Sequence, residues 1–154
     1  METFKILMPY NFSTHDKKAI HFIINAFGGR QGVRVVLFHT YTSPPDIDVT
    51  ASPEIKKMRS GMSYLASELA EKEKGLKEAG QIFIENGFPE EALDYIFKRK
   101  KRNTADEIVD AAGNGQYSAL VLSRKAGKIP QFFSRSIHTR AVSALKNITV
   151  CIAA

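Results

Sequence analysis

Apolar residues along this chain follow two patterns, short continuous runs of strand length and longer stretches with apolar positions at helical spacing. The apolar runs predict five strands, at residues 4–8, 33–39, 92–97, 117–122 and 148–153. The helical spacing predicts four intervening helices, at residues 14–27, 53–85, 105–112 and 132–145. Because strands and helices alternate throughout, we expect an α/β fold with a parallel sheet and helices on both faces.

Two helix starts are predicted from capping residues. Ser13 is expected to be the N-cap of the first helix, with Asp16 as an acidic variant of the capping box three residues later. Thr104 and Glu107 have the same spacing before the third helix. The local sequence therefore predicts where both helices begin.

The second helix has a long apolar stripe. Its members recur in steps of three, four and once seven, at Ile55, Met58, Met62, Leu65, Leu69, Leu76, Ala79 and Phe83. One sheet face or a coiled-coil partner would bury such a stripe. We expect the sheet face, because Gly61, Gly75 and Gly80 weaken a free-standing helix.

Composition indicates one globular domain, spanning residues 1–154, with 44% hydrophobic residues and a net charge of +6. Glu2 and Lys5 interrupt any signal-peptide-like apolar segment, and no apolar stretch approaches the roughly 20 residues of a membrane-spanning helix. We expect a cytoplasmic protein without membrane association.

The single cysteine, Cys151, lies within an apolar run. We expect it to be a buried packing residue and not a nucleophile.

The loop at residues 9–13 joins the first strand to the first helix, a position where α/β sheets often bind ligands. Basic residues follow the predicted strand ends, namely the run Lys98 to Arg102 together with Arg124, Lys125, Lys128 and Arg135. The carboxyl ends of parallel strands share one edge, so these residues could attract anions there. The alternative is that they form an ordinary solvated surface.

The four histidines, His15, His21, His39 and His138, have no metal-ligand spacing, and no catalytic triad or Walker loop is present. We expect neither an enzyme nor a metal site, and only His138, beside the loop after the fourth strand, is of interest. Nucleic-acid binding through the run Lys98 to Arg102 is a further alternative. It is disfavoured because no aromatic residue interleaves with that run.

Several segments resemble the universal stress protein family, in the family's order over nearly the whole chain. They are Met8-Pro9-Tyr10-Asn11-Phe12-Ser13, Leu37-Phe38-His39-Thr40, Thr104 to Ala112, and Ile148-Thr149-Val150-Cys151-Ile152. These are similar to the family's V-P-x-D-x-S, L-L-H-V, P-x-x-x-I-x-x-A-A and P-V-L-V-V. The resemblance implies an adenine nucleotide alpha hydrolase-like fold, with an open five-stranded parallel sheet of order 3-2-1-4-5 and two helices on each face.

ATP-binding members of that family have G-x-x-G after the fourth strand, then nine residues and G-S or G-T. Here the first two glycine positions fall on Ser123 and Ala126, with Gly127 beside the second. A one-residue deletion, which we prefer, places the last pair on Arg135-Ser136, and an ungapped alignment places it on Ser136-Ile137. Neither alignment keeps a motif glycine, so we expect ATP to bind weakly or not at all.

The resemblance also implies which residues would face a nucleotide. Asn11 replaces the aspartate that contacts adenine in ATP-binding relatives, and it keeps an acceptor but loses the charge. Thr40 replaces a valine that contacts adenine. The expected nucleotide-binding positions are Pro9, Tyr10, Asn11, Thr40, Leu122, Ser123, Ala126, Gly127, Arg135, Ser136 and Ile137.

Two hypotheses about the ligand follow. In the first, the chain is a regulatory, stress-response domain with a degenerate ATP loop. In the second, the basic residues replace the missing glycine amides and the chain binds ATP or AMP. In both, the resemblance and the uncharged last strand imply a homodimer through that strand, with Ile148, Val150, Cys151 and Ile152 at the interface.

Overall fold

The computed structural model describes residues 2–42, 53–124 and 133–154, without the side chains of residues 53–63 and 133–136. Its main elements are β1 (Phe4–Pro9), α1 (Asp16–Phe27), β2 (Val33–Tyr41), α2 (Pro53–Glu85), β3 (Leu93–Arg99), α3 (Thr104–Asn114), β4 (Ala119–Ser123), α4 (Phe133–Ala144) and β5 (Thr149–Ala153). A short 3₁₀ helix, η1 (Glu90–Ala92), precedes β3. Most bounds lie within two residues of the expected ones.

The five strands form one sheet of order β3-β2-β1-β4-β5, in which every pairing is parallel. The expected order and direction are confirmed. β1 lies at the centre, and its apolar residues Ile6, Leu7 and Met8 are completely buried. A strand that is covered on both faces needs such a continuous apolar run, which explains why the first strand shows no alternation.

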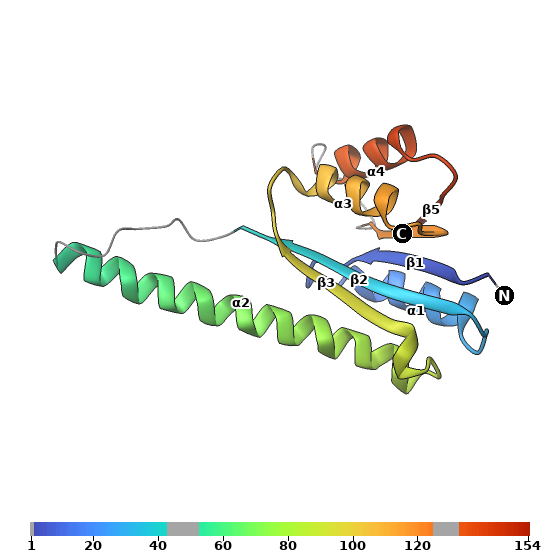
Figure 1. Cartoon of the computed structure of the whole chain (residues 1–154), viewed down its shortest axis with the longest axis horizontal. Coiled ribbons are helices and arrows are strands. Elements are labelled where there is room, and N and C mark those ends of the chain that lie inside the picture. The colour runs from blue at the N-terminus through green and yellow to red at the C-terminus, as the bar shows by residue number, and fades with distance from the viewer. Residues whose placement is uncertain (1, 43–52, 125–132) are drawn as a thin grey trace.

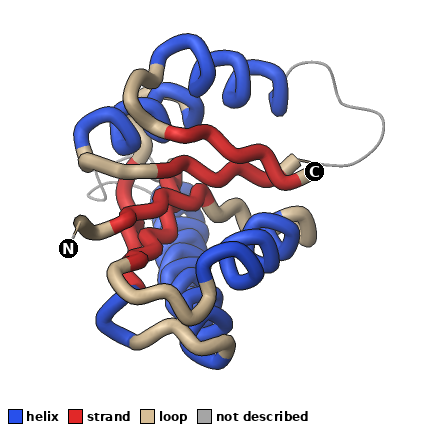
Figure 2. Tube along the Cα trace, turned by 90° about the vertical axis from the view of Figure 1, so that its right-hand side faces the viewer, coloured by secondary structure: helices blue, strands red, loops and turns tan. Residues whose placement is uncertain are grey.

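Two helices cover each face of the sheet, as expected (Figures 1 and 2). On one face, α1 and α2 pack over Ile6, Met8 and Val35. On the other, α3 and α4 pack over Leu7 and Val36. Alternate residues of each strand thus face opposite helix layers, because successive side chains in a strand point to opposite sides.

The long helix α2 uses only part of its stripe on the sheet. Leu76, Ala79 and Phe83 are buried in the core, and each large side chain contributes roughly 1.5–3 kcal/mol through burial. Further toward the N-terminus, Tyr64 is 65% exposed and Leu65 is 40% exposed. Figure 1 shows that the first turns of α2 extend past the sheet. The sheet face therefore accounts for the second half of the stripe, as expected, and the alternative of a coiled-coil partner is not tested.

The start of α1 differs from the expectation. The helix begins at Asp16, and His15 at the N-cap position makes no side-chain hydrogen bond, so Ser13 is not the N-cap. The Asp16 carboxylate nevertheless accepts from the Ser13 N–H at 2.9 Å. That bond also occurs in a capping box, but here it closes the loop before the helix instead of capping its first turn.

The start of α3 differs from the expectation as well, here by one residue. Asn103 is the N-cap, and its side-chain oxygen accepts from the Asp106 N–H at 2.8 Å. Thr104 is the first helical residue. The predicted Thr104 cap is therefore wrong by one residue, and asparagine is at least as good an N-cap as threonine. Glu107 is thereby left to bond the preceding loop.

Candidate functional site

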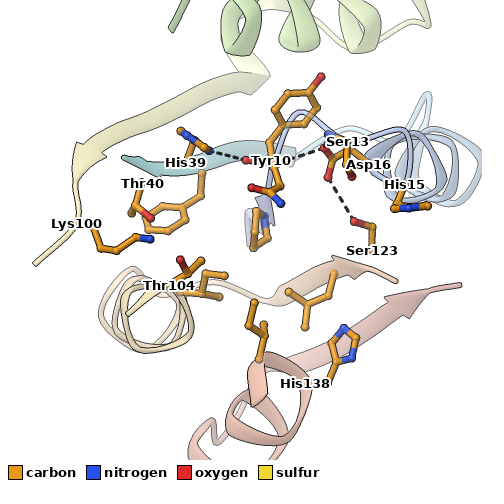
Figure 3. Close-up of a pocket in the computed structure, with 16 residues that line it drawn as sticks. Tyr10, Ser13, His15, Asp16, His39, Thr40, Lys100, Thr104, Ser123 and His138 are labelled. Carbon is orange, nitrogen blue, oxygen red and sulfur yellow. Dashed lines mark hydrogen bonds between the residues drawn. The ribbon is translucent and has the colours of Figure 1, made fainter. Parts of the chain in front are cut away.

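A cavity of about 460 Å³ lies at the carboxyl edge of the sheet. It opens where β1, β2 and β4 end, between the loop after β1 and the helices α3 and α4 (Figure 3). This is the edge at which open α/β sheets bind ligands, because the order of the strands reverses beside β1. Its volume falls within the usual range for small-molecule sites.

The structure brings together seven of the eleven positions that the sequence predicted. From β1 and the following loop, Pro9, Tyr10 and Asn11 line the cavity. Thr40 from β2, Leu122 and Ser123 from β4, and Ile137 from α4 line it as well.

The other four predicted positions are not tested. Ala126 and Gly127 lie outside the described residues, as do the side chains of Arg135 and Ser136. The alignment of the loop after β4 therefore stays a prediction.

Asp16 holds the loop that borders the cavity. Its side chain is 2% exposed, and one carboxylate oxygen accepts from the Asn11 N–H at 3.1 Å and the Ser13 N–H at 2.9 Å. The other oxygen accepts from the Ser123 hydroxyl at 3.3 Å (Figure 3). A buried carboxylate needs such donors, and these three tie the loop after β1 to the end of β4.

His39 at the end of β2 also fixes this loop. Its Nδ1 lies 2.8 Å from the Tyr10 carbonyl oxygen, and since a carbonyl only accepts, Nδ1 must bear the proton. Burial lowers the pKa of His39, and the bond to Tyr10 opposes this in part. His39 is therefore neutral at pH 7. The Phe12 ring meets both Tyr10 and His39 edge to face, with centroids 4.9 Å apart in each pair.

The middle of the cavity is apolar. Phe38 and Leu122 from the sheet, Ile108 from α3 and Ile137 from α4 line it, and all four pack in one hydrophobic cluster. Such walls suit the faces of a flat ring and exclude water from it.

His138, one turn into α4, lines the other side. Burial lowers its pKa first, the nearby Arg124 adds to this, and the Ser123 backbone opposes both. His138 is therefore also neutral at pH 7.

The basic run after β3 is partly neutralised by α3. Lys98 pairs with Glu107 at 3.1 Å, and Arg102 pairs with Asp110. Lys100 lies between these pairs and lines the cavity. The run is therefore not a uniform surface of free cations, which weakens the nucleic-acid hypothesis.

Glu107 organises this segment. It is 4% exposed, and its Oε1 accepts from the N–H groups of Lys101 at 2.7 Å and Arg102 at 3.0 Å. These two bonds, followed by the contact with Lys98, lower the pKa of Glu107 to about 2. The loop between β3 and α3 is thereby fixed beside the cavity.

Four residues that line the cavity were not predicted from the sequence as site residues: Asp16, Phe38, Thr104 and Ile108. Asp16 was treated only as a cap, although an acid beside a strand-to-helix loop is well placed to hold that loop. Thr104 and Ile108 are four residues apart on α3, so they share the helix face that meets the sheet. That spacing, together with the expected position of α3, could have indicated both.

The site as described is suited to binding. It offers an apolar middle, polar groups at both ends and neutral histidines. Among the described residues, no group of three or more His, Cys, Asp or Glu side chains could hold a metal ion. Within the same residues, no helix is long and apolar enough to cross a membrane.

Solved structures with similar folds were found by comparison. A universal stress protein from Archaeoglobus fulgidus superposes with a TM-score of 0.66 at 17% identity, covering 100% of this chain and 96% of its own. The same organism's protein in complex with dAMP gives 0.63 at 16% identity, covering 100% of both chains. A universal stress protein family protein from Arabidopsis thaliana with AMP bound gives 0.56 at 15% identity, covering 98% and 92%. At these identities the likeness shows the fold.

Sequence comparison identifies the family. Among curated proteins, none matches the chain. The model of the universal stress protein family matches residues 2–150. That match spans β1 to β4, all four α-helices and the first two residues of β5. The chain belongs to the universal stress protein family.

Proposed function

We propose that this chain is a stress-response regulatory domain that acts by binding an adenosine nucleotide in the cavity at the carboxyl edge. The observation that supports this best is the cavity itself, whose apolar middle lies between two polar ends. A nucleotide has a matching arrangement, with a flat base and sugar attached to a charged group. Structurally similar family members have been solved with dAMP and with AMP.

A monophosphate fits these observations better than a triphosphate. Ser123 stands at the first glycine position of the ATP motif, and its hydroxyl bonds to Asp16. A glycine there would leave more room and a freer backbone for phosphate groups. We therefore expect ATP to bind no more tightly than roughly 0.1 mM, or about −5.5 kcal/mol, and AMP to bind more tightly than ATP.

The chain is proposed to act through binding and not through turnover. Three histidines line the cavity, His15, His39 and His138, and none of them is hydrogen-bonded to a Ser or Cys side chain within the described residues. The binding event would instead reorder the loop that Asp16 and His39 hold, and thereby change the surface presented to a protein partner.

Calorimetry with AMP, ATP and adenosine tests this proposal, together with mass spectrometry of the natively purified protein. The variant Asn11→Ala removes an exposed side chain that lines the cavity, and Asn25→Ala on α1 is its matched control. We expect AMP binding to weaken several-fold in the first variant and to be unchanged in the second. Low-micromolar ATP affinity would contradict the monophosphate preference. Absence of binding to all three ligands would contradict the function.

We also propose that the domain forms a homodimer through β5. The strand lies at the edge of the sheet, beside β4 only, and it has no charged residue or proline. Ile152 is 43% exposed there. Open sheet edges without such protection readily pair with another strand.

A further inference from the structure

The end of the cavity nearest β2 and β3 consists of hydrogen-bond donors. Thr40 on β2, Lys100 after β3 and Thr104 at the start of α3 all line the cavity there. In Figure 3 their hydroxyl and ammonium groups point toward one another. We call these three residues the donor corner. From the sequence, Thr40 was expected only at a contact with the base, and Thr104 was not predicted as a site residue.

Thr40 is an unusual residue for its place. It is only 8% exposed, in a strand whose neighbours Phe38 and Leu37 are core residues. Its side chain makes no hydrogen bond within the described part of the chain, and it lines the cavity. A ligand oxygen in the cavity would supply the missing partner.

Lys100 contributes the charge. Its backbone N–H donates to the Tyr41 carbonyl at 2.7 Å, which fixes where the side chain starts. Its neighbours Lys98 and Arg102 pair with acids of α3, whereas the Lys100 ammonium makes no ion pair within the described part of the chain. Lys100 is also the only Lys or Arg among the described residues that line the cavity.

The N-terminus of α3 adds to the same field. Thr104 is the first residue of this eleven-residue helix, so the positive end of the helix dipole lies at the donor corner. The acids of the first turn, Asp106 and Glu107, are paired with Arg140 and Lys98. They therefore offset little of the positive field at the corner.

The opposite end of the cavity is less suited to an anion within the described residues. It contains the buried Asp16 carboxylate and the neutral His138, and the Arg124 side chain lies near His138 but does not line the cavity. A phosphate placed there would face Asp16, whereas a phosphate at the donor corner would meet an ammonium, two hydroxyls and a helix N-terminus.

We propose that the donor corner of Thr40, Lys100 and Thr104 is an anion subsite that binds the phosphate group of the ligand. The inference rests on the proposed function as far as the ligand is a nucleotide. The same chemistry would also hold free inorganic phosphate. It places the phosphate beside β3 and α3.

The test is calorimetry with AMP, adenosine and inorganic phosphate on four variants. Lys100→Gln and Thr40→Val each remove one donor with little change of shape. Lys101→Gln is the matched control, since Lys101 is exposed, adjacent and not part of the cavity lining. Arg135→Gln tests the alternative position at the start of α4.

We expect wild-type protein to bind AMP more tightly than adenosine. Lys100→Gln should weaken AMP binding about tenfold and Thr40→Val a few-fold, with adenosine affinity unchanged in both and no effect of Lys101→Gln. The subsite is wrong if Arg135→Gln causes the loss and Lys100→Gln does not, or if Lys100→Gln weakens adenosine and AMP equally.

The same experiment distinguishes failure of the proposed nucleotide function from failure of the anion subsite. If inorganic phosphate binds in a Lys100-dependent way while AMP binds no more tightly than phosphate, the subsite stands and the nucleotide function is wrong. If adenosine binds and phosphate adds nothing, the subsite is wrong and a nucleoside function remains. If none of the three ligands binds, both are wrong.

Discussion

The Ser123 hydroxyl lies 3.3 Å from the Asp16 carboxylate and joins the end of β4 to the loop after β1. Two backbone N–H groups, of Asn11 and Ser13, bond to the same carboxylate. Removing the carboxylate in Asp16→Ala leaves these partly buried bonds without their acceptor. We expect a loss of about 2–3 kcal/mol in the free energy of unfolding, and about 1 kcal/mol for Ser123→Ala.

Urea denaturation of both variants and of the double variant measures this relationship. If the Ser123 hydroxyl acts through Asp16, the free energy of unfolding falls less in the double variant than the sum of the two single decreases. The difference should be roughly 0.5–1 kcal/mol. Strict additivity would show that Ser123 and Asp16 are energetically independent.

Glu107 gives the chain a pH dependence whose sign follows from its pKa. The pKa is about 2 in the folded chain and 4.5 ordinarily, because the Lys101 and Arg102 N–H groups and then Lys98 favour the carboxylate. The folded state therefore binds fewer protons than the unfolded state between these values. The stabilisation is complete above about pH 5 and is lost as the pH falls toward 2. It amounts to at most about 3 kcal/mol.

Glu107→Gln tests this with the exposed Glu90→Gln as its control. At pH 7 we expect Glu107→Gln to lower the free energy of unfolding by about 2–3 kcal/mol, since the charge is lost while one acceptor oxygen remains. At pH 2.5 its deficit relative to wild type should be much smaller. A deficit that is equal at both pH values would contradict the role of the ionised carboxylate.

The sequence predicted the sheet well because the burial of a strand on both faces leaves a direct mark on its composition. Ile6 to Met8 and Val35 to Phe38 had to be apolar, and the alternation with helices then required a parallel sheet. Helix starts were harder, because Asn103 and Thr104 are both acceptable caps and only the loop geometry chooses between them.

The site was predicted only in part, for a related reason. Tyr10, Asn11 and Ser123 follow strand ends, so their place at the carboxyl edge follows from topology alone. Thr104 and Ile108 reach the cavity from a helix, and their contribution depends on how α3 lies on the sheet. Pair interactions such as Asp16 with Ser123 join residues distant in sequence, and no local pattern marks them.

Gly75 and Gly80 are both helical residues of α2, but the surroundings of their Cα atoms differ. A Cβ at Gly75 would lie 3.0 Å from Cε1 of Phe12, whereas a Cβ at Gly80 would meet nothing within 4 Å. Gly80→Ala should stabilise the chain by about 0.5–1 kcal/mol through helix propensity. Gly75→Ala should leave the stability of the chain nearly unchanged or lower it, because the Phe12 ring must move to make room. The backbone of Phe12 has little freedom to adjust, since Phe12 already has a positive φ of 58°.

Thermal denaturation of the two variants side by side checks this difference. Because Phe12 contacts Tyr10 and His39, Gly75→Ala should also shift the NMR signals of these two residues, while Gly80→Ala should not. Equal stabilisation by both alanines would show that the Phe12 ring moves at no cost.

The last prediction concerns the β5 edge. The Thr149 N–H donates to Ser118, and the Ala153 carbonyl accepts from Arg124, so these residues face β4. In a parallel pair alternate residues bond to the same neighbour, which leaves the backbone groups of Val150 and Ile152 directed toward the open edge. Val150 packs its side chain against the α3 and α4 layer, whereas Ile152 is 43% exposed.

Ile152 is therefore the residue at which the homodimer can be tested without disturbing the core. Sedimentation velocity at tens of micromolar should show a dimer for wild-type protein and a monomer for Ile152→Lys. Ile152→Pro should give the same result, because it removes an outward N–H without breaking the ladder to β4. Val142→Lys is the matched control, since Val142 is 65% exposed and belongs to α4 and not to β5. A wild-type monomer, or a dimer that survives both Ile152 changes, would contradict pairing through β5.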